Sequence, residues 1–113
     1  MAKGENLGEL EHVVLLALAR LGAEDAYGMA IVDEIGVRTG RDVSVGAVYS
    51  ALDRMERKGL LASEIGDPSP ERGGRARRFF ALRDPGREAL LETRRSFEAL
   101  WDGLDLPKLD VAP

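Results

Sequence analysis

The sequence of 113 residues contains no cysteine and a single histidine, His12. A zinc site needs several grouped ligands, and His12 has neither a second histidine nor a thiol to join it, so we predict no metal site. We expect His12 to be structural or exposed. The lack of cysteine also gives no reason to expect disulfides or export.

Long apolar runs are missing as well. The longest, residues 13–19, has seven residues, whereas a helix needs about 20 apolar residues to cross a bilayer. We therefore predict a buried helix segment there and no membrane partner. The first residues lack the apolar region of a signal peptide, so we expect a cytoplasmic location.

Catalytic signatures are absent too. The sequence contains no nucleophile paired with an acid or base and no phosphate-cradling motif. We therefore expect a protein that is not an enzyme and that needs no cofactor.

The net charge of −4 argues by itself against a nucleic-acid partner. The charge is unevenly distributed, however: residues 38–58 carry a net charge of +2 and residues 71–95 a net charge of +4. Salt screens charges beyond about 8 to 10 Å, so the local field decides where a phosphate backbone docks. These two basic segments are the candidates for such a contact.

The apolar residues, 44% of the chain, suffice for one domain with a real core. They recur at helical spacing in three segments, each followed by a glycine that favours a helix stop. The segments are residues 7–21 before Gly22, residues 27–39 before Gly40, and residues 45–58 before Gly59. Ser44 is placed to cap the third helix.

Two strands and a last helix follow. Residues 60–65 and 77–82 have the alternation and aromatic content of strands, and a loop rich in Gly, Pro and Arg separates them. Asp84 is expected to cap the last helix, which Pro107 ends. An apolar seam at nearly heptad spacing predicts that this helix forms a dimer interface, made by Leu90, Phe97, Leu100, Trp101 and Leu104.

Three helices followed by a hairpin are the ground plan of a winged helix-turn-helix, in which the third helix enters the DNA major groove. The long last helix is an addition to this plan. The fold class is thus mainly α with a two-stranded β-hairpin wing and a C-terminal dimerisation helix. We divide the chain into a DNA-binding domain (residues 1–83), a dimerisation helix (84–106) and a tail (107–113).

The outer face of the third helix carries short side chains near its start and cations near its end. Short side chains let the backbone approach base edges, and the positive helix N-terminus suits a phosphate. Glycines and arginines of the hairpin loop suit phosphates or a narrow minor groove. The predicted DNA-binding residues are Ser44, Gly46, Ala47, Tyr49, Ser50, Arg54, Arg57, Arg72, Gly74, Arg75 and Arg77.

Plainer interpretations exist for several of these residues. The wing arginines could instead form a solvated hairpin tip, although four arginines around two glycines favour the DNA contact. Arg54 and Arg57 could pair with Glu11 or Asp53 in surface ion pairs worth roughly 0 to 1 kcal/mol. Tyr49 lies at the edge of the apolar face, where its hydroxyl could reach a phosphate, whereas Tyr27 is expected in the core.

At this point the sequence resembles the PadR-like transcriptional regulators. The matching motifs are Leu-Gly-Glu-Leu-Glu at residues 7–11, Ala-Tyr-Gly at 26–28, Gly-Ala-Val-Tyr-Ser-Ala-Leu-Asp-Arg-Met-Glu-Arg-Lys-Gly-Leu at 46–60, Arg-Gly-Gly-Arg-Ala-Arg-Arg-Phe-Phe-Ala-Leu at 72–82 and Pro-Gly-Arg at 85–87. The resemblance implies a dimeric DNA-binding regulator, usually a repressor. It also implies a recognition helix at residues 45–58, a wing at residues 61–82 and C-terminal dimerisation.

Two departures from the family pattern qualify the resemblance. Phe79 and Phe80 stand where the family often has tyrosine, and a single C-terminal helix leaves little room for an effector domain. In some relatives a tryptophan pair across the dimer axis sandwiches a flat aromatic effector, a possible role of Trp101 here.

The predicted partners are therefore double-stranded DNA, as an inverted-repeat operator, and a second copy of the chain. The alternative is a winged-helix protein–protein interaction module that does not bind DNA. The acidic net charge favours this alternative, and the clustered wing arginines oppose it.

Overall fold

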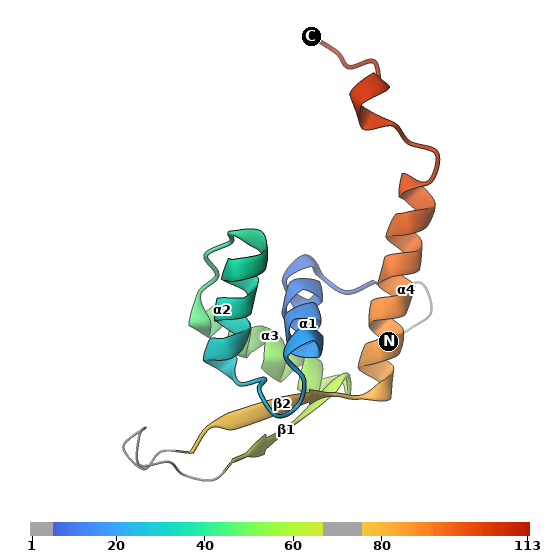
Figure 1. Ribbon diagram of the computed structural model, residues 1–113. Coiled ribbons are helices and arrows are strands. Elements are labelled where there is room, and N and C mark those ends of the chain that lie inside the picture. The colour runs from blue at the N-terminus through green and yellow to red at the C-terminus, as the bar shows by residue number, and fades with distance from the viewer. Residues whose placement is uncertain (1–5, 67–75) are drawn as a thin grey trace.

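Three helices, an antiparallel hairpin and a long fourth helix follow one another along the chain (Figure 1). The computed structural model describes residues 6–66 and 76–113. This order confirms the predicted fold class. The elements are α1 (Glu9–Leu21), α2 (Gly28–Thr39), α3 (Val45–Arg57), β1 (Leu61–Ile65), β2 (Arg78–Leu82), α4 (Asp84–Trp101) and a 3-10 turn, η2 (Leu106–Lys108).

The helix ends follow from local chemistry. The Ser44 hydroxyl accepts a hydrogen bond from the backbone N–H of Ala47 at 3.1 Å, which caps α3 as predicted. Gly22 and Gly40 end α1 and α2 with φ values of 81° and 72°, in the region that glycine adopts without a steric cost.

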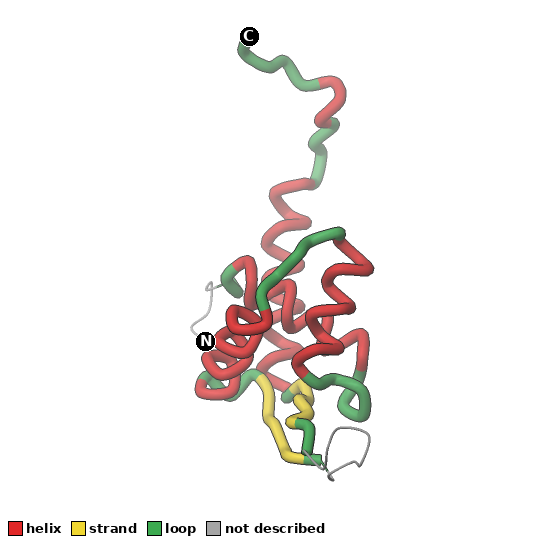
Figure 2. The backbone as a smooth tube through the Cα atoms, turned by 90° about the vertical axis from the view of Figure 1, so that its left-hand side faces the viewer, coloured by secondary structure: helices red, strands yellow, loops and turns green. Residues whose placement is uncertain are grey.

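The core lies where the first three helices meet the hairpin. The central side chain is Phe80 of β2, which has no exposed surface. Its burial fixes the position of the hairpin beneath the helices (Figure 2). The other large, fully buried apolar residues are Val14, Leu15, Leu18, Ile31, Ile35, Val48, Leu52, Met55, Leu60 and Leu61.

The hairpin is joined to the helices by backbone hydrogen bonds. β1 and β2 pair antiparallel, from Leu61 opposite Leu82 to Ile65 opposite Arg78. On the other side of β2, the Phe80 N–H donates to the Ala26 carbonyl at 2.8 Å. The segment between α1 and α2 therefore docks along the open edge of β2.

The start of α4 differs from the prediction. Arg83, not Asp84, is the N-cap residue, and no side chain caps the helix. Arg83 is held in extended conformation because its N–H donates to the Leu60 carbonyl at 3.0 Å, while its own carbonyl accepts from Arg87. Asp84 is thus the first helical residue, and its carboxylate pairs with Arg87 at 2.9 Å.

The end of α4 differs as well. The helix ends at Trp101 rather than near Pro107, because Asp102 turns to an extended conformation and Gly103 adopts a φ of 80°. Leu104, the last residue of the predicted seam, therefore lies beyond the helix. Helix α4 and the following segment project from the other elements, which lengthens the molecule to 59 Å against 31 and 20 Å in the other directions (Figures 1 and 2).

Within residues 6–66 and 76–113, none of the helices has both the length and the apolar character needed to cross a membrane.

Candidate nucleic-acid interface

The outer face of α3 carries small side chains near the helix N-terminus. Gly46 and Ser50 are exposed and Ala47 is half-buried. A Cβ atom added at Gly46 would meet nothing within 4 Å, so the backbone there is open to an approaching ligand. The apolar face of the same helix is buried in the core, which leaves this outer face as the part available for contact.

The C-terminal half of α3 carries cations with different partners. Arg54 Nε lies 3.8 Å from Glu11 Oε2, and Lys58 Nζ lies 3.2 Å from the same oxygen. Arg54 thus makes one of the ion pairs that the plainer interpretation names. Such a half-exposed pair is worth at most about 1 kcal/mol, so a phosphate can compete for Arg54. Arg57 is exposed and makes no ion pair with any residue that the structure describes.

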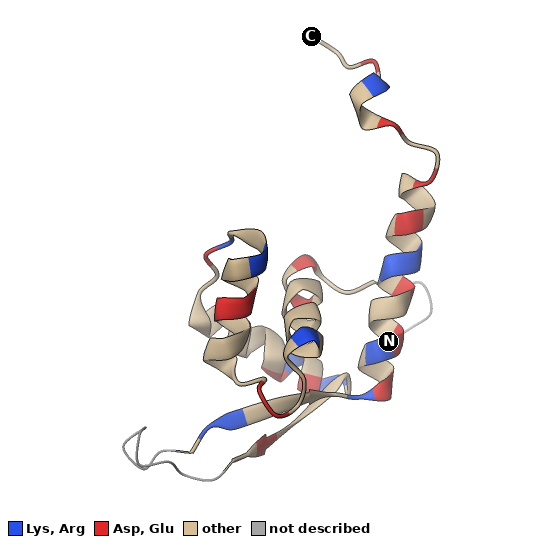
Figure 3. Cartoon of the chain, viewed as in Figure 1, with Lys and Arg blue, Asp and Glu red and all other residues tan. Residues whose placement is uncertain are grey.

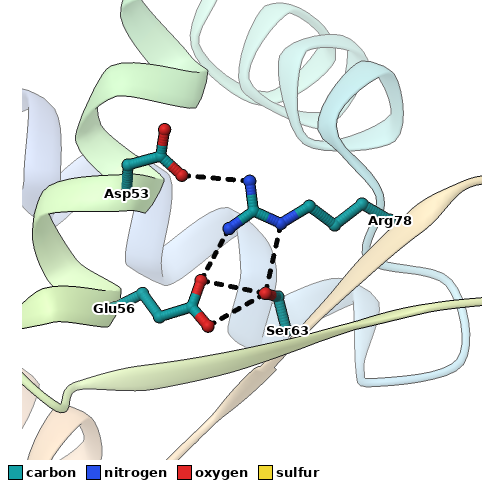
Figure 4. Close-up of polar contacts among 4 residues, drawn as sticks. All are labelled: Asp53, Glu56, Ser63 and Arg78. Atoms are coloured by element: carbon teal, nitrogen blue, oxygen red, sulfur yellow. Dashed lines mark hydrogen bonds and ion pairs between the residues drawn. The ribbon is translucent and has the colours of Figure 1, made fainter.

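Arg78 joins the hairpin to α3 (Figure 4). Its guanidinium donates to Asp53 Oδ1 at 3.0 Å, to Glu56 Oε1 at 2.6 Å and to the Ser63 hydroxyl at 3.1 Å. The Ser63 hydroxyl also bonds the Glu56 carboxylate at 2.9 Å. We call Asp53, Glu56, Ser63 and Arg78 the Arg78 cluster. It fixes the angle between the hairpin and α3 through four side chains.

The sequence analysis missed this cluster, because it treated Arg78 as one more wing cation. The available signal was the spacing of Asp53 and Glu56, which are three residues apart and therefore lie on the same side of a helix. Two carboxylates this close together on a helix repel each other, and a cation placed between them removes the repulsion.

The electrostatics of the cluster keep Arg78 charged. Partial burial lowers the pKa of the guanidinium, but the hydrogen bonds and negative charges of Asp53 and Glu56 outweigh this effect, so its pKa lies above the ordinary value. The guanidinium also lies 4.8 Å from the centre of the Phe80 ring. Arg78 is thus committed to ion pairs within the protein, whereas its neighbour Arg77 has no carboxylate partner among the residues that the structure describes.

Arg77 lies at the foot of the wing on an aromatic support. Its guanidinium carbon is 4.0 Å from the centre of the Tyr27 ring, and this ring packs edge-on against Phe79 at 5.8 Å. This stacking restrains the arginine without using its hydrogen-bond donors. Tyr27, expected in the core, is in fact half-buried beneath this cation.

Tyr49 packs against the start of α2. A Cβ atom at Gly28 would lie 2.2 Å from the phenol oxygen of Tyr49, so only glycine leaves room for the ring in this position. The ring is also tilted against Phe80, 6.3 Å away between centres. The ring of Tyr49 is thus held over the N-terminus of α2. The contact of Tyr49 with DNA stays a prediction.

The wing residues Arg72, Gly74 and Arg75 lie outside the described residues. Of the predicted wing cations, the structure describes Arg77, which directly precedes β2. Figure 3 shows positive charge at this end of the strand.

Three of the predicted dimer residues, Leu90, Phe97 and Trp101, line an open face between α1 and α4, whereas Leu100 and Leu104 are not part of its lining. Leu90 is half-buried, whereas Phe97, Leu100, Trp101 and Leu104 are about half exposed or more. A groove of about 510 Å³ runs along this face, and Leu16 of α1 is part of its lining. His12 also lies there, half-buried and stacked on Phe97 with 6.5 Å between ring centres.

Three helices that pack on a two-stranded hairpin, with the outer face of the third left exposed beside that hairpin, define a winged helix-turn-helix domain. The chain belongs to one family of this class: the sequence model of the Transcriptional regulator PadR-like family matches residues 15–92. The protein is therefore a transcriptional regulator of the PadR-like family.

Comparisons with individual relatives support the same family assignment. The chain is 40% identical over 78 residues to Transcriptional regulator Rv3488 of Mycobacterium tuberculosis, a match that covers 67% of this chain and 66%, just under two thirds, of that relative. A PadR family regulator from Eggerthella lenta is 32% identical with a TM-score of 0.65, covering 84% of this chain and 81% of the other. A PadR family regulator from Clostridium difficile shares the fold, with a TM-score of 0.67, 24% identity and coverage of 82% and 91%.

Proposed function

We propose that the protein is a sequence-specific DNA-binding repressor that acts in the cytoplasm as a homodimer on an inverted-repeat operator. Each subunit inserts α3 into a major groove and lays its wing along the adjacent backbone or minor groove. The observation that carries this proposal is the outer face of α3, where an open Gly46 and Ser50 precede the exposed Arg54 and Arg57.

The acidic net charge does not oppose this proposal, because the carboxylates beside the C-terminal half of α3 are paired. Asp53 and Glu56 are bound to Arg78, and Glu11 is bound to Lys58 and Arg54. Charges on distant elements are screened over about 8 Å at physiological salt. These three carboxylates are matched by three cations, so the exposed Arg57 is an additional positive charge that a phosphate at α3 meets.

Dimerisation is proposed from the exposed apolar side chains of α1 and α4. Leu16, Phe97 and Trp101 are 44%, 48% and 57% exposed and lie around one groove. Burying Phe97 and Trp101 would contribute roughly 1.5 to 3 kcal/mol each, before the entropy cost of ordering them. A second copy offers the same face, so one symmetric contact covers both grooves. The dimer then occludes the operator and blocks transcription.

Selection of bound duplexes from a random pool tests this function directly. We expect enrichment of an inverted repeat, because a symmetric dimer reads two identical half-sites. For a dimer that contacts about six phosphates, the slope of log K against log salt should approach about −5. The absence of any enriched sequence, with no binding to duplex at low salt, would instead favour the protein–protein interaction module.

The variant F97A/W101A tests the proposed interface. It should sediment as a monomer and lose tight binding to a two-half-site duplex while keeping weak half-site binding. The matched control is V37A, which removes methyl groups from an 84% exposed valine of α2 and should leave both properties unchanged. A double variant that remains dimeric would contradict the assigned interface.

A further inference from the structure

Beyond α4 the chain carries apolar side chains that its own domain leaves uncovered. Leu104, Leu106 and Leu109 are 50%, 49% and 47% exposed, and Val111 is 84% exposed. The segment leads away from the helices and the hairpin (Figures 1 and 2). In the 3-10 turn η2, side chains three residues apart lie on the same side, so Leu106 and Leu109 form one apolar projection.

A second surface feature matches this projection. A groove of about 260 Å³ runs between α1 and α2, and Val13, Ala17 and Ile35 are part of its lining. Because a water molecule occupies about 30 Å³ in the liquid, this groove has room for more than one aliphatic side chain. Leu16 lines this groove and also the groove between α1 and α4, so the two surfaces are continuous.

We propose that residues 104–111 of each subunit lie in the α1/α2 groove of the partner subunit, with Leu106 and Leu109 against its apolar lining. This inference rests on the homodimer of the proposed function. It assigns to the segment after α4 the role of an exchanged arm that interlocks the two subunits.

Charge complementarity supports this occupant. Arg20 and Arg38 line the groove, and both bind the same oxygen of Glu34, at 3.3 and 3.0 Å. Two cations that share one carboxylate leave a net positive charge at the groove. The arm carries Asp105 and Asp110 against the single cation Lys108, so its net charge is negative. An acidic, leucine-bearing segment therefore fits a groove that is apolar inside and basic at its edge.

The reach of the arm is sufficient. Helix α1 has 13 residues and is therefore about 20 Å long. The segment from Asp102 to Leu109 spans up to about 22 Å when η2 keeps its 3-10 turn. When the α4 helix of the partner subunit covers Leu16, the arm that follows this helix is delivered to the adjoining α1/α2 groove. The exchange also ties α2 of each subunit to the dimer, and thereby restrains the spacing of the two α3 helices.

Removal of residues 104–113 is the first test, because it leaves all four helices and the hairpin intact. The dimer dissociation constant, measured by analytical ultracentrifugation, should rise at least about tenfold while the circular dichroism spectrum is retained. The L106S/L109S variant should reproduce this effect in the full-length chain. The matched control V111S changes an apolar arm residue that is not part of the projection formed by Leu106 and Leu109, and it should change the constant less than about threefold.

Disulfide trapping tests the position of the arm, and the cysteine-free sequence gives it no background. A V13C chain and an L109C chain of different mass are mixed and oxidised. The arm exchange predicts a covalent heterodimer, whereas the control mixture of L109C with E64C, on the exposed strand β1, should give none.

The outcomes of these tests distinguish the proposed arm exchange from the proposed homodimer. Either of two outcomes would overturn the exchange and leave the proposed function standing: a chain without residues 104–113 that dimerises with unchanged affinity, or a mixture of V13C and L109C chains that gives no covalent heterodimer. A full chain that is monomeric at tens of micromolar would overturn the proposed homodimer and the exchange together.

Discussion

The Arg78 cluster gives the sharpest test of how the wing and α3 work together. In the R78M variant the long apolar stem is kept and the guanidinium is removed. This change breaks the hydrogen bonds to Asp53, Glu56 and Ser63 and leaves two carboxylates without their cation. We expect it to lower both the free energy of unfolding and the affinity for DNA, for different reasons.

The stability effect follows from exposure. Hydrogen bonds to charged groups contribute about 1.5 to 3 kcal/mol when buried. The Arg78 side chain is 33% exposed and Asp53 45%, however, so solvent screening reduces each pair toward the surface value of at most about 1 kcal/mol. Two pairs and the contact with Phe80 then sum to about 1 to 2 kcal/mol. At about 4 °C per kcal/mol, the melting temperature should fall by about 4 to 8 °C.

The effect on DNA arises from position and charge rather than from a lost phosphate contact. Without Arg78 the hairpin is free to change its angle to α3, and Asp53 and Glu56 repel the backbone. We expect about tenfold weaker operator binding in a fluorescence anisotropy titration, equivalent to 1.4 kcal/mol. The slope of log K against log salt should become shallower by less than it does on loss of a phosphate contact, because Arg78 itself releases no counterion and only the screened repulsion by the two carboxylates changes.

Two further variants make this interpretation refutable. R57A removes a cation without a described partner, so its dimer should lose two phosphate contacts and the slope should become shallower by about 2. Adding D53N and E56Q to R78M should restore part of the affinity, since the uncompensated carboxylates are then neutral. If R78M binds as tightly as the wild type, or flattens the salt slope as much as R57A does, Arg78 is not a positioning residue.

Further predictions concern single contacts. G86A should unfold the protein or cost more than about 3 kcal/mol in urea denaturation, because its Cβ would lie 2.1 Å from the Leu60 carbonyl oxygen. G46A, open on all sides, should instead gain about 0.5 to 1 kcal/mol of stability while weakening operator binding, if the α3 backbone approaches the bases. T93V should cost about 1 to 3 kcal/mol, because the buried Thr93 hydroxyl accepts from the Leu7 N–H at 3.2 Å and valine would leave that donor unpaired; equal stability would show that water replaces the bond.

The elements that local chemistry controls were predictable from the sequence. The bounds of α3 agree within one residue, because the Ser44 cap and the apolar spacing of Val48, Leu52 and Met55 act through near neighbours in the chain. The strands agree equally well. The predicted start of α4 was wrong because the Leu60 carbonyl, which is distant in the sequence, holds Arg83 in the cap position. The spacing of residues along the sequence does not indicate this contact.

The residues that make up the candidate site were predictable from the sequence, but the ion pairs among their charged side chains were not. The sequence indicates that Gly46, Ser50 and Arg57 share an outer face, and the structure places them on exposed surface. It does not indicate which cations remain available, since this depends on side chains brought together from different elements. Arg78 and Arg77 are neighbours in sequence, yet one is bound by two carboxylates and the other lies on the ring of Tyr27.

This division of the cations explains why tight DNA binding should require two subunits. Among the described cations of α3 and the wing foot, Arg54, Lys58 and Arg78 have carboxylate partners, whereas Arg57 and Arg77 have none among the residues placed by the structure. About three phosphate contacts per subunit would release too few counterions to hold one subunit on duplex DNA at physiological salt, since each contributes only about 0.9 to the salt slope. A dimer doubles that number and ties both sets into one binding event. The apolar side chains of α4, which lie far from the α3 surface, would then control DNA affinity as strongly as any arginine.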